Sequence, residues 1–142
     1  MIRKMEEADY DDAFRLWSGT NGMGLRSLDD SREGIGRFLT KNPDTCFVSE
    51  DHEKLTGTIL CGHDGRRGYI YHLAVEDEHR GEGIGRALVE AAENALIKEG
   101  INKSALVVFR ANISGNRFWE RMGYLEREDL VYRNRSLKED NE

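Results

Sequence analysis

The stretch His79-Arg80-Gly81-Glu82-Gly83-Ile84-Gly85-Arg86 lies between an apolar segment and a long amphipathic segment, and it decides the fold. Glycines occupy three alternate positions, and a predicted helix begins at Ile84 inside the stretch. Glycines leave successive backbone N–H groups uncovered, and a helix N-terminus adds the positive end of its dipole. The sequence therefore predicts a backbone cradle for a pyrophosphate, and with it a phosphorylated cofactor.

The segments on either side of the glycines have the periodicity of a strand and of a helix. Apolar residues between Ile84 and Glu99 recur on one helical face, and Gly100 is placed to end that helix. The segment from Gly68 to Val75 is predicted as a strand that carries Tyr69 and Tyr71. Because such a helix crosses over to a parallel neighbour, parallel pairing is expected to begin beside the glycines.

The remaining elements are predicted from periodicity, capping residues and turns. Strands are expected at 2–4, 45–49, 55–61 and 105–109, with a final pair at 124–125 and 130–132. Helices are expected at 8–18, between the caps at 29–31 and Asn42-Pro43, and at 114–122. Short turns make strands two to four antiparallel. The predicted fold class is α/β (α+β), with a mixed, mostly antiparallel sheet of about six or seven strands and about four helices.

Length and composition favour one globular domain. The chain has 142 residues, 38% of them hydrophobic, and a net charge of −6. The acidic balance argues against nucleic-acid partners and favours cationic substrates. No run reaches the ~18 apolar residues of a membrane helix, and the N-terminus lacks the apolar core of a signal peptide. We expect a cytoplasmic protein with no membrane partner, a domain over 1–135 and a charged, frayed tail over 136–142.

The two cysteines are predicted to serve in packing and not in catalysis or metal binding. Cys46 and Cys61 both lie in apolar, strand-like runs, and neither has the spacing of metal ligands. A catalytic cysteine needs a nearby base and a lowered pKa, and nothing close in sequence supplies either. Buried free thiols and no metal are therefore predicted.

Two nucleotide-binding motifs are excluded by the glycine spacing. A dinucleotide fingerprint needs Gly-x-Gly-x-x-Gly, but the sixth position is Arg86 when counted from Gly81 and Leu88 when counted from Gly83. A P-loop needs Gly-Lys-Ser/Thr, which is absent. The phosphorylated cofactor is therefore of another kind.

The sequence resembles the GCN5-related N-acetyltransferase (GNAT) superfamily. That family has Arg/Gln-x-x-Gly-x-Gly/Ala between a strand and a helix, and this chain has Arg80-Gly81-Glu82-Gly83-Ile84-Gly85. A second block, with Asn112, Gly115 and Phe118-Trp119-Glu120-Arg121-Met122-Gly123-Tyr124, is similar to the family's Asn-x-x-Ala-x-x-Leu-Tyr-Glu-x-x-Gly-Phe segment. The turn from Gly62 to Gly68 resembles small bacterial acetyltransferases of the YpeA type.

The resemblance implies a GNAT-like fold, splayed between strands 4 and 5, that binds acetyl-CoA. A β-bulge near the end of the fourth strand would open the sheet. Backbone groups of Leu73, Ala74 and Val75 would pair with the pantetheine arm, and the Leu73 amide would donate to the thioester carbonyl. The remaining cofactor-binding residues would be Arg80, Gly81, Glu82, Gly83, Ile84, Gly85, Arg86 and Asn112. Asn112 is also placed to cap the following helix.

The implied reaction moves an acetyl group to the primary amine of a small molecule or peptide by direct attack. Tyr69 and Tyr71 alternate onto the strand face that meets the acceptor in the family. Many relatives carry a glutamate base at the position of Tyr69, so the base here stays unassigned and a water chain is expected. Imidazole has the best pKa for a base, but strict alternation turns His72 to the opposite face unless the bulge reorients it.

Trp119 replaces the tyrosine with which relatives protonate the leaving thiolate. An indole N–H donates a hydrogen bond but is no acid near neutral pH, so a slower or acid-independent enzyme is predicted. Two alternatives stay open. One is a protein N-terminal acetyltransferase with an open groove lined by the first two helices and the last strand pair, where Asp29, Asp30 and Glu33 would hold a cationic amine. The other is a non-catalytic acetyl-CoA sensor. A homodimer is possible, since relatives often dimerise.

Overall fold

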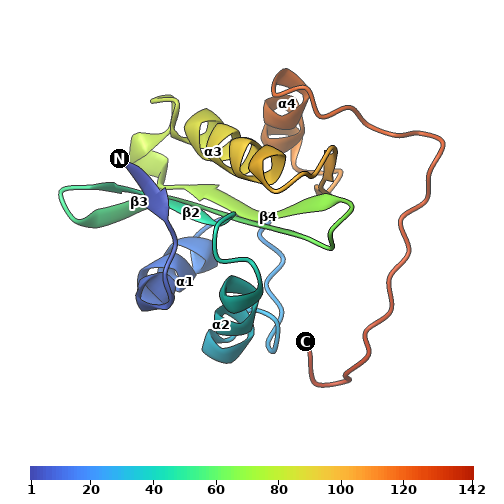
Figure 1. Ribbon diagram of the computed structural model, residues 1–142, viewed down its shortest axis with the longest axis horizontal. Helices are drawn as coiled ribbons and strands as arrows, with labels where there is room; N and C mark the ends of the chain where they lie inside the picture. Colours follow the sequence, from blue (N-terminus) through green and yellow to red (C-terminus); the bar gives the residue numbers. More distant parts are fainter.

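A single five-stranded sheet separates two layers of helices (Figure 1). The computed structural model describes all of residues 1–142. The strands lie in the order β1-β2-β3-β4-β5, and β1 to β4 pair antiparallel whereas β4 and β5 pair parallel. Their bounds are β1 (Ile2–Lys4), β2 (Phe47–Asp51), β3 (Lys54–His63), β4 (Gly68–Val75) and β5 (Ser104–Ala105). The predicted mixed sheet, with parallel pairing next to the glycine stretch, is confirmed.

Four α-helices flank the sheet, and two of them begin at side-chain caps. They are α1 (Tyr10–Ser18), α2 (Arg32–Lys41), α3 (Ile84–Lys98) and α4 (Ile113–Arg121), with short 3-10 turns η1 (Glu7–Asp9) and η2 (Asp77–His79). The Ser31 side chain accepts from the Gly34 amide at 3.0 Å, which starts α2 as predicted. None of these helices has the length and apolar character needed to cross a membrane.

Each face of the sheet buries its own hydrophobic cluster. Figure 1 shows α1 and α2 on one face and α3 and α4 on the other. The first cluster is Met5, Ala13, Leu16, Trp17, Ile35, Leu39, Cys46, Val48, Leu55, Leu60 and Ala74. The second is Ile59, Cys61, Ile70, Leu88, Val89, Ala92, Leu96 and Ile101. Leu60 and Cys61 fall in different clusters, as the alternation of side chains along β3 requires.

The sheet opens between β4 and β5. The two strands pair only at Gly68 with Ser104 and at Tyr69 with Ala105. Beyond that point Val107 and Phe109 are 57% and 59% exposed, so the buried strand predicted over 105–109 is wrong after Ala105. The predicted splay between strands 4 and 5 is confirmed. The residues after Ala105 are exposed because they diverge from β4 and lose the strand pairing that would bury them.

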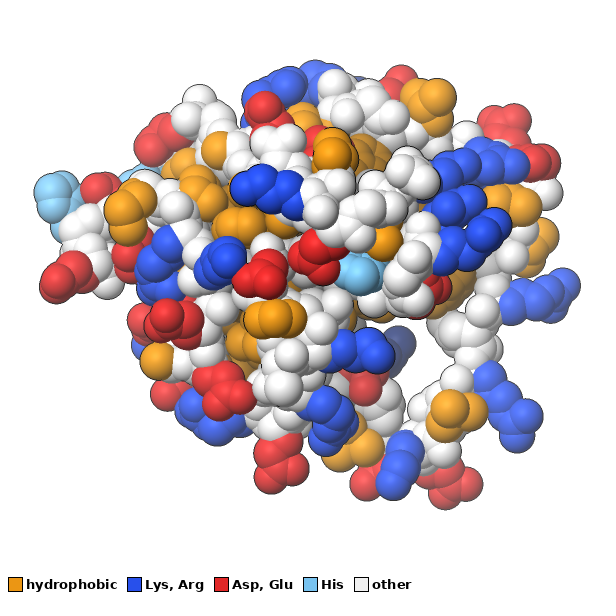
Figure 2. Space-filling model, viewed as in Figure 1, with side chains coloured by type: hydrophobic (Ala, Val, Ile, Leu, Met, Phe, Trp, Pro, Cys, Tyr) orange, Lys and Arg blue, Asp and Glu red, His pale blue; other side chains and the backbone are white.

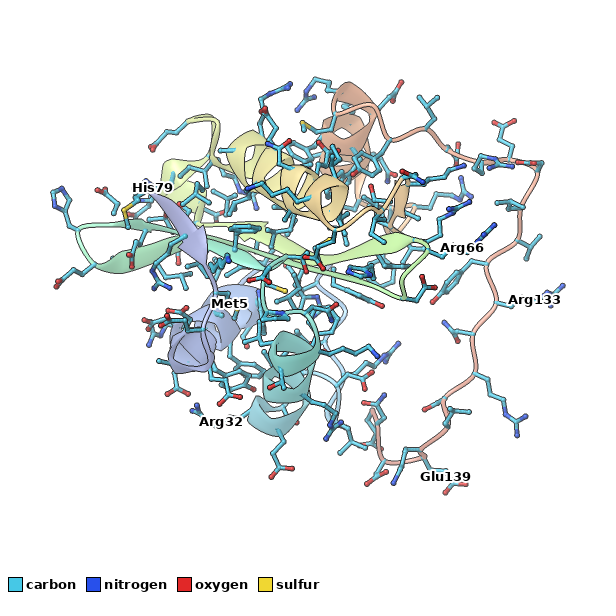
Figure 3. All side chains as sticks on the ribbon, viewed as in Figure 1. Met5, Arg32, Arg66, His79, Arg133 and Glu139 are labelled. Carbon is cyan, nitrogen blue, oxygen red and sulfur yellow. The ribbon has the colours of Figure 1, made fainter.

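The expectation of a sixth and seventh strand is wrong. Residues 124–125 and 130–132 have no regular structure, and Leu125 and Val131 are 79% and 76% exposed. Figure 2 shows an opening between the C-terminal part of the chain and the rest of the molecule, and Arg133 points outward in Figure 3. A strand needs a neighbouring edge to pair with, and a two-residue β5 that has diverged from β4 offers none.

The end of the tail is bound rather than frayed. After α4 the chain runs round to the α2 side, where Glu139 lies (Figures 1 and 3). Asn141 Oδ1 accepts from the Leu28 amide at 3.0 Å, and Asn141 Nδ2 donates to Asp29 at 2.9 Å. The Ser27 amide also donates to the Glu142 carbonyl at 2.6 Å. The expectation of a frayed end is therefore wrong, and the last residues tether the loop that precedes α2.

The turn between β2 and β3 holds two non-glycine residues in the left-handed region, with φ of 51° at His52 and 65° at Glu53. Two-residue hairpin turns of this kind favour Asn-Gly, because other residues pay for the positive φ. We expect His52→Asn/Glu53→Gly to raise the free energy of unfolding by about 1–2 kcal/mol, measured by urea denaturation. Glu53→Ala keeps the positive φ on a residue with a Cβ, and an equal gain in that control would contradict the account.

Candidate functional site

The glycine stretch forms a loop of uncovered amides at the start of α3. The amides of residues 81–86 donate no hydrogen bond to any group of the chain. Gly81 and Gly83 have φ of 82° and 83°, values that favour glycine, and nothing lies within 4 Å of where their Cβ atoms would be. The open amides and the N-terminal end of the α3 dipole point at the same space, which suits an anion.

The side chains of this loop are less free to bind a ligand than its backbone amides are. Arg80 Nε lies 3.1 Å from Asp77, and Glu82 lies 3.3 Å from His79, which Figure 3 labels beside the loop. A Cβ on Gly85 would come within 3.3 Å of the Phe118 ring, so this glycine serves the contact between α3 and α4. Phosphate binding would therefore rely mainly on backbone N–H groups.

The edge of β4 beyond Tyr69 faces the opening and has no strand partner. Glu76 donates its amide to Thr56 of β3 at 2.8 Å. Because backbone groups alternate along a strand, the amides of Val75 and Leu73 turn toward the open edge. Ala74 pairs with Thr58 of β3. The open edge offers one free strand ladder to an extended ligand.

A β-bulge interrupts β4 at His72. The pairing with β3 shifts between Thr58, opposite Ala74, and Leu60, opposite Tyr71, so β4 holds one extra residue there. His72 itself has φ of 29°. A non-glycine residue in this region costs on the order of 1–3 kcal/mol, and such strain gathers at functional sites. The bulge sends Tyr71 and His72 to the same face, so the strict alternation that turned His72 away does not hold.

Tyr69 and Tyr71 stack on the face covered by α1 and α2. Their ring centroids lie 4.7 Å apart, and the edge of Phe38 on α2 meets Tyr71 at 5.6 Å. Burial raises the pKa of Tyr69 to about 12, and burial also raises the pKa of Tyr71. Both phenols are therefore neutral near pH 7, which suits them to line an acceptor site and not to act as bases.

Asn112 caps α4 and keeps a free amide group. Its Oδ1 accepts from the Gly115 amide at 2.9 Å, which is the predicted capping role. Its Nδ2 makes no hydrogen bond, and a Cβ on Gly22 of the α1–α2 loop would lie 3.4 Å from it. Asn112 thus stands beside that loop with one donor available.

Trp119 lies with the α3 and α4 layer, on the opposite face of the sheet from the two tyrosines. Its ring meets Phe118 and Tyr124 edge to face, each at 5.1 Å, and it packs against the second cluster. The indole N–H has no partner within the chain. The structure therefore groups Tyr69 with Tyr71 and holds Trp119 apart from them.

One pair was missed by sequence reasoning. His72 Nε2 lies 2.5 Å from Asp30 Oδ1, and their side chains are only 11% and 7% exposed. The sequence offered Asp30 only as a helix cap or as an amine ligand, and it stands 42 residues before His72. The β-bulge implied by the family was the one signal that could have reoriented His72.

The other predicted acidic groups are placed differently. Asp29 accepts from Asn141, and Glu33 is exposed at the start of α2. Cys46 and Cys61 are buried free thiols, as predicted. No group of three or more His, Cys, Asp or Glu side chains is arranged to hold a metal ion.

Comparison with known proteins agrees with this geometry. A sequence model described as "Acetyltransferase (GNAT) family" matches residues 7–124. Acetyltransferase SG1711 of Sodalis glossinidius is 32% identical over 141 residues, which are 99% of this chain and 98% of that protein.

Solved structures share the fold. Ard1 from Thermoplasma volcanium superimposes with a TM-score of 0.78 at 19% identity, over 88% of this chain and 82% of that one. Rv2747 from Mycobacterium tuberculosis, in complex with CoA and NLQ, does so with a TM-score of 0.73 at 20% identity, over 90% and 73%. The sequence-based predictions of the fold and of an acetyl-CoA-dependent acetyltransferase are confirmed at the level of the family. The chain belongs to the acetyltransferase (GNAT) family.

Proposed function

We propose that this acetyltransferase moves the acetyl group of acetyl-CoA to the primary amine of a small molecule or peptide by direct attack. The observation that carries the proposal is the run of uncovered amides at residues 81–86, placed next to the unpaired edge of β4. A pyrophosphate and an extended pantetheine arm need these two features in this order.

The chain offers a specific set of groups to the donor substrate. The amides of residues 81–86 would hold the pyrophosphate, and the open edge at Leu73, Ala74 and Val75 would pair with the pantetheine arm. The Leu73 amide would donate to the thioester carbonyl oxygen and stabilise the charge that develops there. The free Nδ2 of Asn112 would reach the arm from the other side of the opening.

The acceptor amine must lose a proton before it can attack, whereas the thioester is already activated. An alkyl ammonium with a pKa near 10.4 costs about 4–5 kcal/mol to deprotonate at pH 7. Once neutral, its nitrogen can attack the thioester carbon without a covalent enzyme intermediate. The thiolate, whose pKa is about 8.5, leaves without obligatory protonation.

The acceptor side favours a compact amine. Tyr69, Tyr71 and Phe38 supply an aromatic wall, and Asp29 adds negative charge near Tyr71. A groove for a protein N-terminus was expected to use the last strand pair and Asp30, but that pair is not formed and Asp30 is bound to His72. These observations support a small molecule or a short peptide as the acceptor.

The test is release of coenzyme A thiol from acetyl-CoA in the presence of a panel of polyamines, aminoglycosides, amino acids and short peptides. Mass spectrometry of the acceptor must show an added acetyl group. We expect turnover with at least one amine that exceeds thioester hydrolysis by more than tenfold. Tight acetyl-CoA binding without transfer to any amine would instead support the sensor.

The variant Trp119→Tyr tests whether the absence of a phenolic general acid limits turnover. The resemblance to the family implies that a phenol at this position gives its proton to the leaving thiolate, and general acid assistance is worth ~10²–10⁴-fold when proton transfer limits the rate. We expect kcat to rise, with little change in the KM for acetyl-CoA. Trp119→Phe removes the N–H without supplying an acid and serves as the control. A Trp119→Tyr enzyme no faster than the parent would show that the absent phenol does not limit turnover.

A further inference from the structure

A histidine and a buried aspartate form a pair on the acceptor face of β4. His72 Nε2 and Asp30 Oδ1 are 2.5 Å apart. Every buried side-chain nitrogen or oxygen in the chain has a hydrogen-bond partner, yet His72 Nδ1 has none. His72 Nδ1 is therefore not completely buried. One ring nitrogen is paired with Asp30, and the other is left without a partner in the chain.

Further hydrogen bonds hold Asp30 in place. Asp30 Oδ2 accepts from the Arg26 amide at 2.6 Å, and the Asp30 carbonyl accepts from the Tyr10 hydroxyl at 2.6 Å. Asp30 directly precedes Ser31, the N-cap of α2, so the helix dipole favours its negative charge. A charged carboxylate at this place needs a donor, and His72 Nε2–H supplies it.

The imidazole ring is equally fixed. Trp17, which is fully buried, meets the His72 ring edge to face at 4.8 Å. Thr58 accepts from Trp17 Nε1 at 2.9 Å and donates to the His72 carbonyl at 3.0 Å. The bulge is thus supported by a hydrogen-bonded chain from α1 through β3, and the ring has one orientation.

This arrangement selects a tautomer. A carboxylate at Nε2 keeps the proton on Nε2 and leaves the lone pair on Nδ1, which is the pattern of a histidine oriented by an acid for use as a base. The same carboxylate stabilises the imidazolium that forms when Nδ1 takes a proton. The other ionisable groups around the pair are Tyr10, Tyr71, Asp29 near Tyr71, and Arg32 over the Tyr10 ring.

We propose that His72, oriented by Asp30, is the general base that takes the proton from the acceptor ammonium. The inference rests on the proposed transfer to an amine and assigns the base that the sequence left open. His72 shares a face with Tyr71 and directly precedes Leu73, whose amide faces the thioester edge. The base therefore lies one residue from the proposed oxyanion donor.

The proposed step removes two protons from the acceptor nitrogen and breaks the C–S bond of the thioester. An ammonium N–H bond breaks, and its proton moves to His72 Nδ1, directly or through one water. The freed lone pair forms the bond to the thioester carbon, the C–S bond breaks, and sulfur leaves with its electron pair. The second proton that nitrogen loses goes to sulfur or solvent, and solvent then takes the proton from the imidazolium.

The test compares His72→Gln with the parent as a function of pH, with the best amine of the panel. We expect kcat/KM for the amine to fall on the order of 10²–10⁴-fold at pH 7 while coenzyme A affinity, measured by calorimetry, stays within threefold. Without a base the variant must use the neutral amine, so its deficit shrinks about tenfold per pH unit toward the pKa of the amine. A merely structural role would not produce that convergence. His52→Asn, at an exposed histidine in the β2–β3 turn, is the matched control.

Asp30→Asn gives an independent test if His72→Gln unfolds. An amide at this position can donate to Nε2 and push the proton onto Nδ1, so we expect a loss on the order of a hundredfold or more in kcat with coenzyme A affinity retained. A rate within threefold of the parent for either folded variant, or the same acidic limb of the pH profile in His72→Gln, overturns the inference. A parent that acetylates no amine overturns the proposed function and the inference with it.

Discussion

Gly81→Asp is expected to lower the affinity for coenzyme A on the order of a hundredfold. The residue lies at the start of the uncovered amides, with φ of 82° and open space where a Cβ would be. Asp tolerates the left-handed region better than most residues, so the fold should survive. Its carboxylate would stand beside the pyrophosphate, where repulsion between charges a few ångströms apart is worth roughly 2–4 kcal/mol near a protein surface.

Gly81→Asn is the matched control, because it has the same shape and backbone preference without the charge. Calorimetric titration with coenzyme A should give a loss for Gly81→Asn that is at least tenfold smaller than for Gly81→Asp. The difference should also shrink in high salt, since repulsion between exposed charges is screened. Equal losses in the two variants would mean that the pyrophosphate does not bind at this loop.

Trp17→Ala is expected to destabilise the fold by about 3–5 kcal/mol. Trp17 is fully buried in the first cluster, and its indole N–H donates to Thr58 at 2.9 Å. Truncation would leave a large cavity between α1 and the sheet and would remove the donor for a buried hydroxyl. A domain of this size has about 5–15 kcal/mol of total stability, so the loss would be a large share of it.

Urea denaturation followed by circular dichroism measures this effect without relying on the fluorescence of the replaced tryptophan. Phe14→Ala is the control on the same helix, because Phe14 is 38% exposed and its truncation should cost far less. If Trp17→Ala cost no more than Phe14→Ala, the first cluster would not depend on α1 in the way its burial indicates.

Local signals in the sequence predicted most of the fold. The β4 strand is the one predicted, and α3 ends within one residue of its predicted bound. Ser31 and Asn112 cap α2 and α4 by the hydrogen bonds that their positions predict. These elements depend on periodicity and on caps close in sequence, so the local prediction agrees with the structure that tertiary packing produces.

The end of the chain could not be predicted in the same way. Apolar residues at 124–125 and 130–132 favour strands, but a strand forms only against an available edge. Whether β5 offers that edge depends on how far it follows β4, which is decided by long-range packing. The contact of Asn141 with Asp29 spans 112 residues and has no local signature.

The candidate site could likewise be predicted only in part. Its cofactor side consists of backbone amides and glycines that are close in sequence, so a contiguous motif could predict it. The proposed base depends on one extra residue in β4, which reverses the direction of His72, and on Asp30 from a distant loop. Strict alternation cannot foresee a bulge, and no spacing in the sequence joins the two side chains.

The buried cysteines have a practical consequence for the assay of released thiol. Burial raises the pKa of Cys46 to about 11 and that of Cys61 to about 12, and both side chains are 1% exposed or less. Neither thiol will compete for an aromatic disulfide reagent near pH 8 while the protein is folded, because the thiolate is the reacting form. Both become reactive on unfolding. The same reagent can therefore record turnover first and, in urea, titrate the fraction of chains that have opened.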